Sequence, residues 1–154
     1  GDVSRRLRLH EASTMAGLAF NQAGLGLCHA ISHALGGMYH IPHGRLNAIL
    51  LPAVIGCNGH AAGEKYAKLS AAAGFVGNAP AIAVRNLKNA LIRLRRELNM
   101  PATLQQAGVN PLQLRQDMEA IVKAALADPC CETNPVRPDK AMVQSILQQV
   151  TGIG

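Results

Sequence analysis

Apolar residues recur at helical spacing along most of this chain of 154 residues, and no segment alternates with a period of two over a convincing length. Residues Leu87, Leu91, Leu94 and Leu98 illustrate the pattern. The sequence therefore predicts an all-α fold, an irregular multi-helix bundle of about seven or eight helices. The expected helices cover residues 4–22, 26–37, 43–58, 60–73, 80–98, 101–108, 111–127 and 140–150.

Glycine and proline residues set the expected boundaries of these helices. Gly24 and Gly26 interrupt the first apolar pattern, and the pair Gly36 and Gly37 can end the second. Pro52 lies within the third pattern, where a missing N–H group predicts a kink or a break. The proline-rich segment 128–139 is expected to be a loop before the last helix.

The size and composition of the chain predict a single domain over residues 1–154. Hydrophobic residues make up 49% of the chain, which argues against disorder. Aromatic residues make up only 3%, so the core must be built from aliphatic side chains. The longest apolar run, residues 48–56, is too short to span a bilayer, and the sequence has no recognisable signal peptide. We therefore expect no membrane partner.

The formal net charge is +6, and the densest basic stretch is residues 85–97. Its leucines follow helical spacing, which favours an amphipathic helix with a solvated basic face over an anion-binding or partner-facing surface. Nucleic-acid binding through residues 85–96 is a third hypothesis. The stretch has no interleaved stacking aromatics, so we expect no nucleic-acid partner.

The four cysteines lie at positions 28, 57, 130 and 131, and no two of them form a C-x-x-C pair. The adjacent Cys130 and Cys131 lack the spacing of a zinc knuckle. Nothing in this pattern indicates a disulfide framework. The sequence therefore predicts reduced thiols and a cytoplasmic location.

Four of the six histidines lie within residues 28–44, namely His29, His33, His40 and His43. Residues four apart share a helix face, so His29 and His33 project together. His43 follows Pro42 and precedes Gly44, which predicts a place in the first turn of the next helix. If that helix folds back over the first, three imidazoles converge. The segment lacks the glutamate that metalloproteases place after the first histidine, so a zinc protease is not favoured.

The convergence of three histidines favours a metal or catalytic site over ordinary core packing. His40 alone is better interpreted as structural. Imidazole suits zinc, iron, copper and nickel alike, and spacing does not decide which two or three of the rings bind the ion.

The stretch "GLCHAISHALGGMYHIPHG" closely resembles the signature of the iron-containing (group III) alcohol dehydrogenases. The following "NAILLPAVIGCN" and the later "ALADPCCETNP" also resemble segments of that family, the latter through Asp128, Cys130, Asn134 and Pro135. The resemblance covers nearly the whole chain. The signature positions that match in register are Gly26, His29, His33, Gly36, Pro42, His43 and Gly44.

The resemblance implies the all-helical C-terminal domain of a metal-dependent, NAD(P)-linked alcohol dehydrogenase or aldehyde reductase. It implies that His29 and His43 are metal ligands and that His33 is a catalytic, non-ligand neighbour of the substrate and nicotinamide. His40 lies outside the signature and is expected to be structural or pocket-lining. The implied cofactors are Fe²⁺, whose ligands would equally satisfy Zn²⁺, and NAD or NADP. The implied substrates are short-chain primary alcohols and their aldehydes.

The family completes its metal site with an aspartate and a further histidine upstream, and it has an N-terminal nucleotide-binding domain. Neither is present, so we expect this domain to be incomplete at its N-terminal side, to supply two of the metal ligands and to be inactive alone. The resemblance also implies a homo-oligomer. Some relatives work inside bacterial microcompartments, so the resemblance also implies a microcompartment as an alternative location to the cytoplasm. The alternative is a non-enzymatic helical metal-binding or interaction module.

Overall fold

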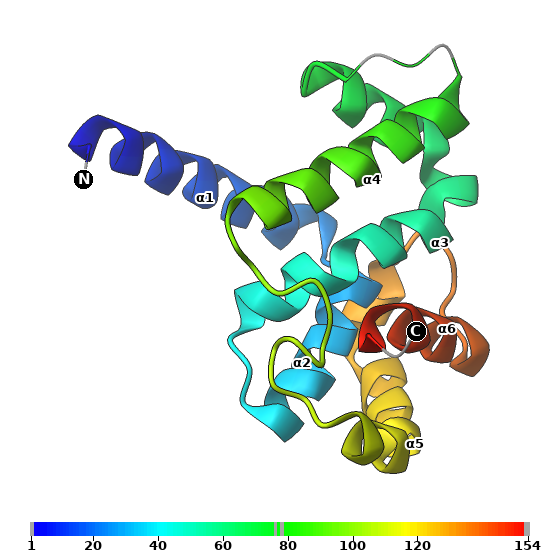
Figure 1. The fold of residues 1–154 in the computed structure, drawn as a ribbon. Coiled ribbons are helices and arrows are strands. Elements are labelled where there is room, and N and C mark those ends of the chain that lie inside the picture. The colour runs from blue at the N-terminus through cyan, green and yellow to red at the C-terminus, as the bar shows by residue number, and fades with distance from the viewer. Residues whose placement is uncertain (1, 76, 78, 153–154) are drawn as a thin grey trace.

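The computed structural model describes residues 2–75, 77 and 79–152, and all regular structure in these residues is helical. The predicted all-α class is therefore confirmed. The arrangement is an irregular bundle in which α2 is surrounded by later helices (Figure 1). The elements are α1 (Val3–Ala23), α2 (Leu27–Tyr39), α3 (His43–Ala72), α4 (Pro80–Glu97), α5 (Pro111–Ala127), the 3-10 helix η1 (Pro129–Thr133) and α6 (Lys140–Thr151).

The core is aliphatic, as the composition predicts, and α2 lies at its centre. Leu27, Ile31 and Leu35 of α2 are completely buried. Helices α3 and α5 and the helix η1 contact α2, and α6 packs against α3 and α5. The other large side chains that are almost fully buried are Leu46, Ile49, Leu50, Leu104, Leu114, Ile121, Val143, Ile146 and Leu147. Close aliphatic packing therefore fixes the position of α2.

The described residues form six α-helices, fewer than the seven or eight expected. Two of the predicted helices, residues 43–58 and 60–73, are one helix, α3, with a kink at Ala62 (φ −111°, ψ 15°). Residues 101–108 form turns instead of a helix. Helical backbone continues through Pro52, and the departure from helical backbone angles lies at Ala62, so the expectation of a break at Pro52 is wrong.

The carbonyl group that Pro52 leaves without a partner is bonded from a different helix. Proline has no N–H group, so the carbonyl of Ala48, four residues earlier, receives no bond within the helix. Arg95 Nη1, on α4, donates to the carbonyl oxygens of Ala48 at 3.3 Å and Ile49 at 3.4 Å. The packing of α4 against α3 thus compensates locally for the proline.

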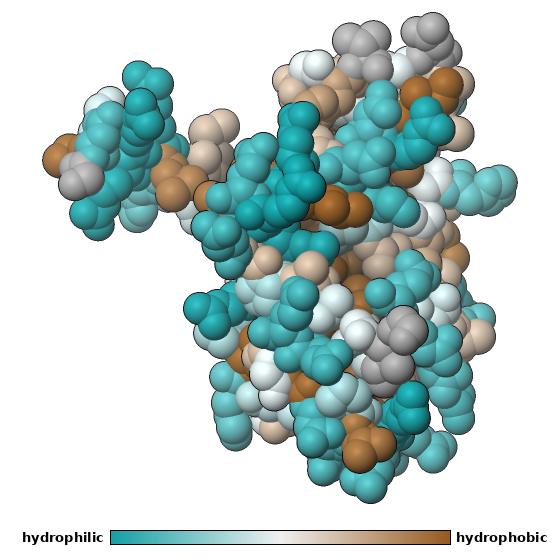
Figure 2. Space-filling view, viewed as in Figure 1, coloured by the Kyte–Doolittle hydropathy of each residue, from teal (hydrophilic) through white to brown (hydrophobic). Residues whose placement is uncertain are grey.

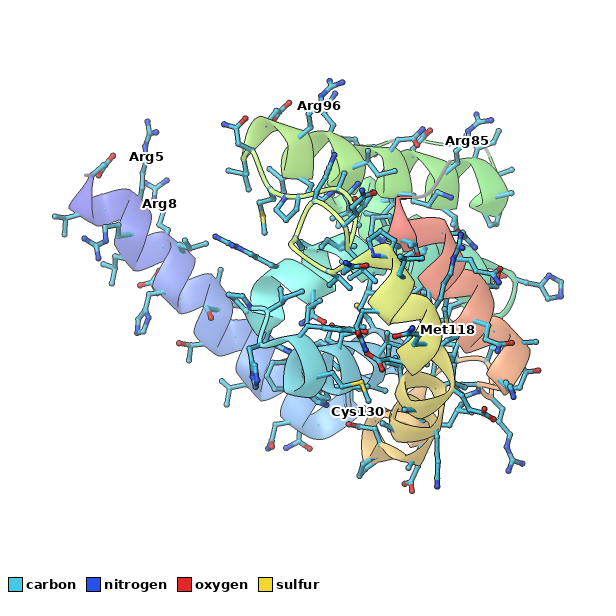
Figure 3. All side chains as sticks on the ribbon, turned by 60° about the horizontal axis from the view of Figure 1, so that its bottom comes forward. Arg5, Arg8, Arg85, Arg96, Met118 and Cys130 are labelled. Carbon is cyan, nitrogen blue, oxygen red and sulfur yellow. The ribbon has the colours of Figure 1, made fainter. Side chains whose placement is uncertain are left out.

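Helix α4 has the solvated basic face that the sequence predicts. Arg85 and Arg96 point away from the body of the molecule (Figure 3). Only Ala83 of this helix is buried, and its leucines remain partly exposed. No helix among the described residues is long and apolar enough to cross a membrane.

Helix α1 projects away from the other helices and buries none of its residues (Figure 1). Large apolar side chains such as Leu9, Met15 and Leu18 are therefore exposed on it, and apolar residues are visible on its surface (Figure 2). The helix ends at Gly24, as predicted, where φ is +75° and Thr133 occupies the space that a side chain would need.

Helix α2 continues past Gly36 and Gly37, so the expectation that this pair ends it is wrong. It ends instead at Tyr39, and His40 adopts the left-handed conformation with φ 54°. The backbone N–H of His40 donates to the carbonyl of Gly36 at 3.0 Å. The backbone of His40 therefore ends α2, which fits the structural role expected of this residue, and its side chain is exposed.

Candidate metal centre

Three imidazole rings converge where α2 and α3 meet. His29 and His33 lie one turn apart on α2, and His43 is the first residue of α3. The ring centroids are 5.1 Å apart for His29 and His43, 5.1 Å for His33 and His43, and 6.2 Å for His29 and His33. The tight turn after Tyr39 folds α3 back over α2. The convergence predicted from the spacing is therefore confirmed.

Asn47 joins two of these rings. Its Nδ2 lies 2.9 Å from His43 Nε2 and 3.3 Å from His29 Nε2. Asn47 is four residues after His43 on α3, so the two side chains share a helix face. Because one amide nitrogen reaches both Nε2 atoms, these two ring nitrogens face a common point.

Two side chains from α2 orient the Asn47 amide. The hydroxyl of Ser32, which is completely buried, donates to Asn47 Oδ1 at 2.7 Å. The thiol of Cys28 donates to the same oxygen at 3.5 Å. With its oxygen held by two donors, the amide turns its NH₂ group toward the histidines. A polar network within an aliphatic core therefore fixes the geometry of His29 and His43.

The electrostatics around His29 favour a neutral ring. Burial lowers the pKa of His29, and the neighbouring His43 and His33 lower it further, while Asp128 acts in the opposite direction. A neutral imidazole has a free lone pair on one nitrogen, which is the form that binds a metal ion. The converging Nε2 atoms of His29 and His43 thus form a donor set that fits a divalent transition-metal ion such as iron or zinc.

His33 stacks against His43 and also pairs with a carboxylate. Its Nδ1 lies 2.8 Å from Asp128 Oδ2. Burial raises the pKa of Asp128, but hydrogen bonds from the backbone of Cys130 and from His33 outweigh that effect and lower it. The carboxylate is ionised and can only accept, so Nδ1 of His33 carries the hydrogen. Nε2 of His33 is then available as a proton acceptor, on a side chain that is 45% exposed.

The four cysteines are all free, which agrees with the predicted reduced thiols. Burial raises the pKa of Cys130 to about 11, and the hydrogen bond and negative charge of Asp128 raise it in the same direction. Cys131 has a separate partner, because its Sγ donates to the carbonyl of Ala125 at 3.1 Å. The two adjacent thiols therefore lie in different surroundings.

A second amide network fixes the start of α2, nearly two turns before His33. Asn134 Oδ1 accepts from the backbone N–H of Leu27 at 3.1 Å. The amides of Asn134 and buried Asn58 also bond each other reciprocally, at 3.0 and 2.9 Å. These bonds hold the first turn of α2 to α3 and to the segment after η1. Both asparagines lie in the segments that resemble the alcohol dehydrogenase family.

Sequence reasoning identified the three convergent histidines but missed Asn47 and Ser32. The i,i+4 spacing from His43 to Asn47 is a signal that could have indicated Asn47. Asp128 was noted only as part of a resemblance, because no spacing rule connects it to His33. The apolar side chains of α2 face the core, so the histidine face is the more open side of this helix.

Comparison with known proteins identifies one family. The model for the Fe-containing alcohol dehydrogenase family, C-terminal, matches residues 1–151. The NADPH-dependent butanol dehydrogenase of Clostridium saccharobutylicum is 35% identical over 150 residues, covering 97% of this chain and 39% of the relative. The 1-propanol dehydrogenase PduQ of Salmonella typhimurium is 41% identical over 155 residues, covering 96% of this chain and 41% of the relative. The chain thus spans about two fifths of the length of these relatives.

Solved structures have the same fold. The iron-containing alcohol dehydrogenase from Thermococcus thioreducens superposes with a TM-score of 0.86 at 31% identity, covering 97% of this chain and 38% of that protein. A 1,3-propanediol oxidoreductase superposes with a TM-score of 0.83 at 35% identity, covering 90% of this chain and 36% of that protein. The helical bundle is therefore found in larger proteins of this kind.

Proposed function

The chain belongs to the Fe-containing alcohol dehydrogenase family, whose C-terminal model matches residues 1–151, and from this premise we propose that it forms the helical, metal-binding part of an NAD(P)-linked alcohol dehydrogenase. The full enzyme interconverts short-chain primary alcohols and their aldehydes. The names of two relatives, a butanol dehydrogenase and a 1-propanol dehydrogenase, support this substrate class.

In this proposal His29 and His43 are metal ligands through their Nε2 atoms. The observation that carries it is the position of Asn47 Nδ2, which lies within hydrogen-bond distance of both nitrogens. Two rings held by adjacent helices around one point need little rearrangement to bind one ion. Iron is the ion that the family name indicates, and Zn²⁺ would accept the same imidazole donors.

When bound, the divalent ion supplies Lewis acidity to the alcohol or carbonyl oxygen, and the nicotinamide nucleotide supplies the hydride chemistry. His33 contributes proton transfer in this scheme. Its Nδ1 hydrogen is held by Asp128, so its Nε2 lone pair is directed away from that carboxylate. During oxidation His33 accepts at Nε2 the proton that leaves the alcohol hydroxyl, and during reduction it returns a proton to the oxygen.

Asp128 acts on the reaction only through His33 and is therefore a positioning residue. The 2.8 Å contact fixes the ring orientation and the tautomer of His33. Asp128 Oδ1 is itself held by the backbone N–H of Cys130 at 2.8 Å. This arrangement keeps His33 beside the two proposed ligands without making it one of them.

The test uses the full-length enzyme and the variants His29→Ala and His43→Ala, with His60→Ala as the matched control on an exposed part of α3. We expect each of the first two variants to lose bound metal and at least about 99% of alcohol oxidation, because a lost ligand removes the ion. His60→Ala should retain both. Metal content by elemental analysis and NAD(P)-coupled alcohol oxidation are measured on the same preparations. Retention of both properties after loss of both histidines would contradict the assignment.

The homo-oligomeric state, the cytoplasmic or microcompartment location and the single metal-binding domain over residues 1–154 stay predictions from the sequence. The exposed apolar side chains of α1 support a covered interface for that helix in the full protein.

A further inference from the structure

A group of three different donor side chains lies next to the histidine pair. A ring nitrogen of His33, a carboxylate oxygen of Asp128 and the Sγ of Cys130 all lie within 4.8 Å of one another. His33 comes from α2, Asp128 follows α5, and Cys130 lies in η1. Figure 3 shows Cys130 between the ribbons of α2 and α5. Three elements therefore bring a nitrogen, an oxygen and a sulfur donor to one place.

The carboxylate of Asp128 orders this group in advance. Its Oδ2 accepts from His33 Nδ1, and its Oδ1 accepts from the backbone N–H of Cys130, each at 2.8 Å. The carbonyl of Asp128 also accepts from the backbone N–H of Cys131 at 3.0 Å, which closes the first turn of η1. A cation entering this group would thus find its ligands oriented by existing hydrogen bonds.

The group is also accessible. The side chain of His33 is 45% exposed and that of Asp128 is 16% exposed. A set of three protein ligands with an open side is the arrangement in which zinc keeps one exchangeable position. Imidazole and thiolate are poor ligands for Mg²⁺ or Ca²⁺, which prefer oxygen alone.

We propose that His33, Asp128 and Cys130 form a second cation site, separate from the His29–His43 pair, that takes Zn²⁺ or a similarly borderline divalent cation. The two sites use different atoms, because the ligand pair faces its common point through Nε2 of His29 and His43. The second site uses Nδ1 of His33, the nitrogen that lies 2.8 Å from Asp128 Oδ2, and the thiol of Cys130.

Cation binding changes the protons at two of these ligands. The Cys130 thiol releases its proton to solvent as the sulfur coordinates the ion. Nδ1 of His33 gives up its hydrogen to bind the ion, and the neutral ring then carries its hydrogen on Nε2. His33 consequently has no lone pair with which to accept a proton from an alcohol. If His33 accepts the alcohol proton, as the proposed function states, Zn²⁺ at the second site inhibits alcohol oxidation.

The first test detects the thiolate ligand without any assay of activity. Metal-free full-length protein is titrated with CoCl₂, and the near-ultraviolet absorption of a thiolate-to-cobalt charge transfer is recorded. We expect the band in the wild type and in a His29→Ala/His43→Ala variant. It should be absent in Cys130→Ser and present in Cys131→Ser, the matched control, because the Cys131 thiol is bonded to Ala125.

The second test measures inhibition of iron-loaded enzyme by ZnCl₂. The zinc concentration for half inhibition should rise at least about tenfold in Cys130→Ser, as expected for a lost ligand, and stay unchanged in Cys131→Ser. Lack of the cobalt band in the wild type, or its survival in Cys130→Ser, would overturn the second site. Equal zinc inhibition of wild type and Cys130→Ser would overturn the inhibitory role. The cobalt experiment remains decisive if the protein has no dehydrogenase activity, so the two proposals fail separately.

Discussion

Replacement of Arg95 by methionine tests whether α4 supports the proline within α3. Methionine retains an apolar stem of similar length but has no guanidinium group. The carbonyls of Ala48 and Ile49 then lose the donor that reaches them from α4. The same substitution at Arg96, the exposed neighbour, is the matched control.

The expected loss follows from the geometry of the two bonds. A hydrogen bond from a charged group contributes about 1.5–3 kcal/mol when well formed. The distances of 3.3 and 3.4 Å are longer than the usual range for such a bond, which places the contribution of Arg95 at or below the lower limit of that energy range. We therefore expect Arg95→Met to reduce the free energy of unfolding by about 1–1.5 kcal/mol. For a chain of this size that corresponds to a fall in Tm of roughly 3–5 °C.

A double-mutant cycle with Pro52→Ala separates this effect from ordinary packing. Alanine restores an N–H at position 52, which can donate to the carbonyl of Ala48 within the helix. With alanine at position 52, Arg95→Met should lower the free energy of unfolding by less than about 0.5 kcal/mol. Arg96→Met should have a small effect whether residue 52 is proline or alanine. Thermal unfolding of the four proteins of the cycle gives their free energies of unfolding. An equal cost of Arg95→Met with and without Pro52 would refute the compensation, because the arginine would then act through something other than the freed carbonyl.

Three further substitutions test positions in α2 and in the contacts that fix where it starts. Gly24→Ala should lower the free energy of unfolding by roughly 1–3 kcal/mol, because φ is +75° and an added Cβ would lie 2.5 Å from Thr133. Gly37 lies in helical backbone with open space around it, so Gly37→Ala should instead raise the free energy of unfolding by about 0.5–1 kcal/mol in the same thermal scans. Asn134→Ala should cost roughly 3 kcal/mol in urea unfolding, because it leaves the buried amide of Asn58 and a helix N–H without partners; a loss below about 1 kcal/mol would mean that water replaces these bonds.

The helices could be predicted because each one is specified by its own residues. Residues 111–127 begin with Pro111, directly after the capping residue Asn110, and form a helix with the predicted bounds. The prediction failed at Pro52, where the deciding interaction comes from Arg95, 47 positions after the carbonyl that it reaches. It failed also at Gly36 and Gly37, because packing of Leu35 and its neighbours outweighs the low helix propensity of glycine.

In the candidate site, too, the local contacts could be predicted from the sequence and the long-range contact could not. Helical spacing and a short turn were enough to bring His29, His33 and His43 together, since all three lie within 15 consecutive residues. The contact between His33 and Asp128 spans 95 positions and has no local signal. It depends on how η1 packs against α2, which only the whole fold determines.

The buried polar residues are the strongest physical argument that this end of the bundle is built for a purpose other than stability. Ser32 is completely buried among aliphatic side chains, where an apolar residue would cost nothing in hydrogen bonding. Its hydroxyl instead holds the oxygen of Asn47, whose nitrogen faces His29 and His43. A bundle selected only for packing would have no reason to put a hydroxyl and an amide beside two imidazoles. Their shared orientation is explained if the two ring nitrogens must be held toward one point, which is the requirement of a metal centre.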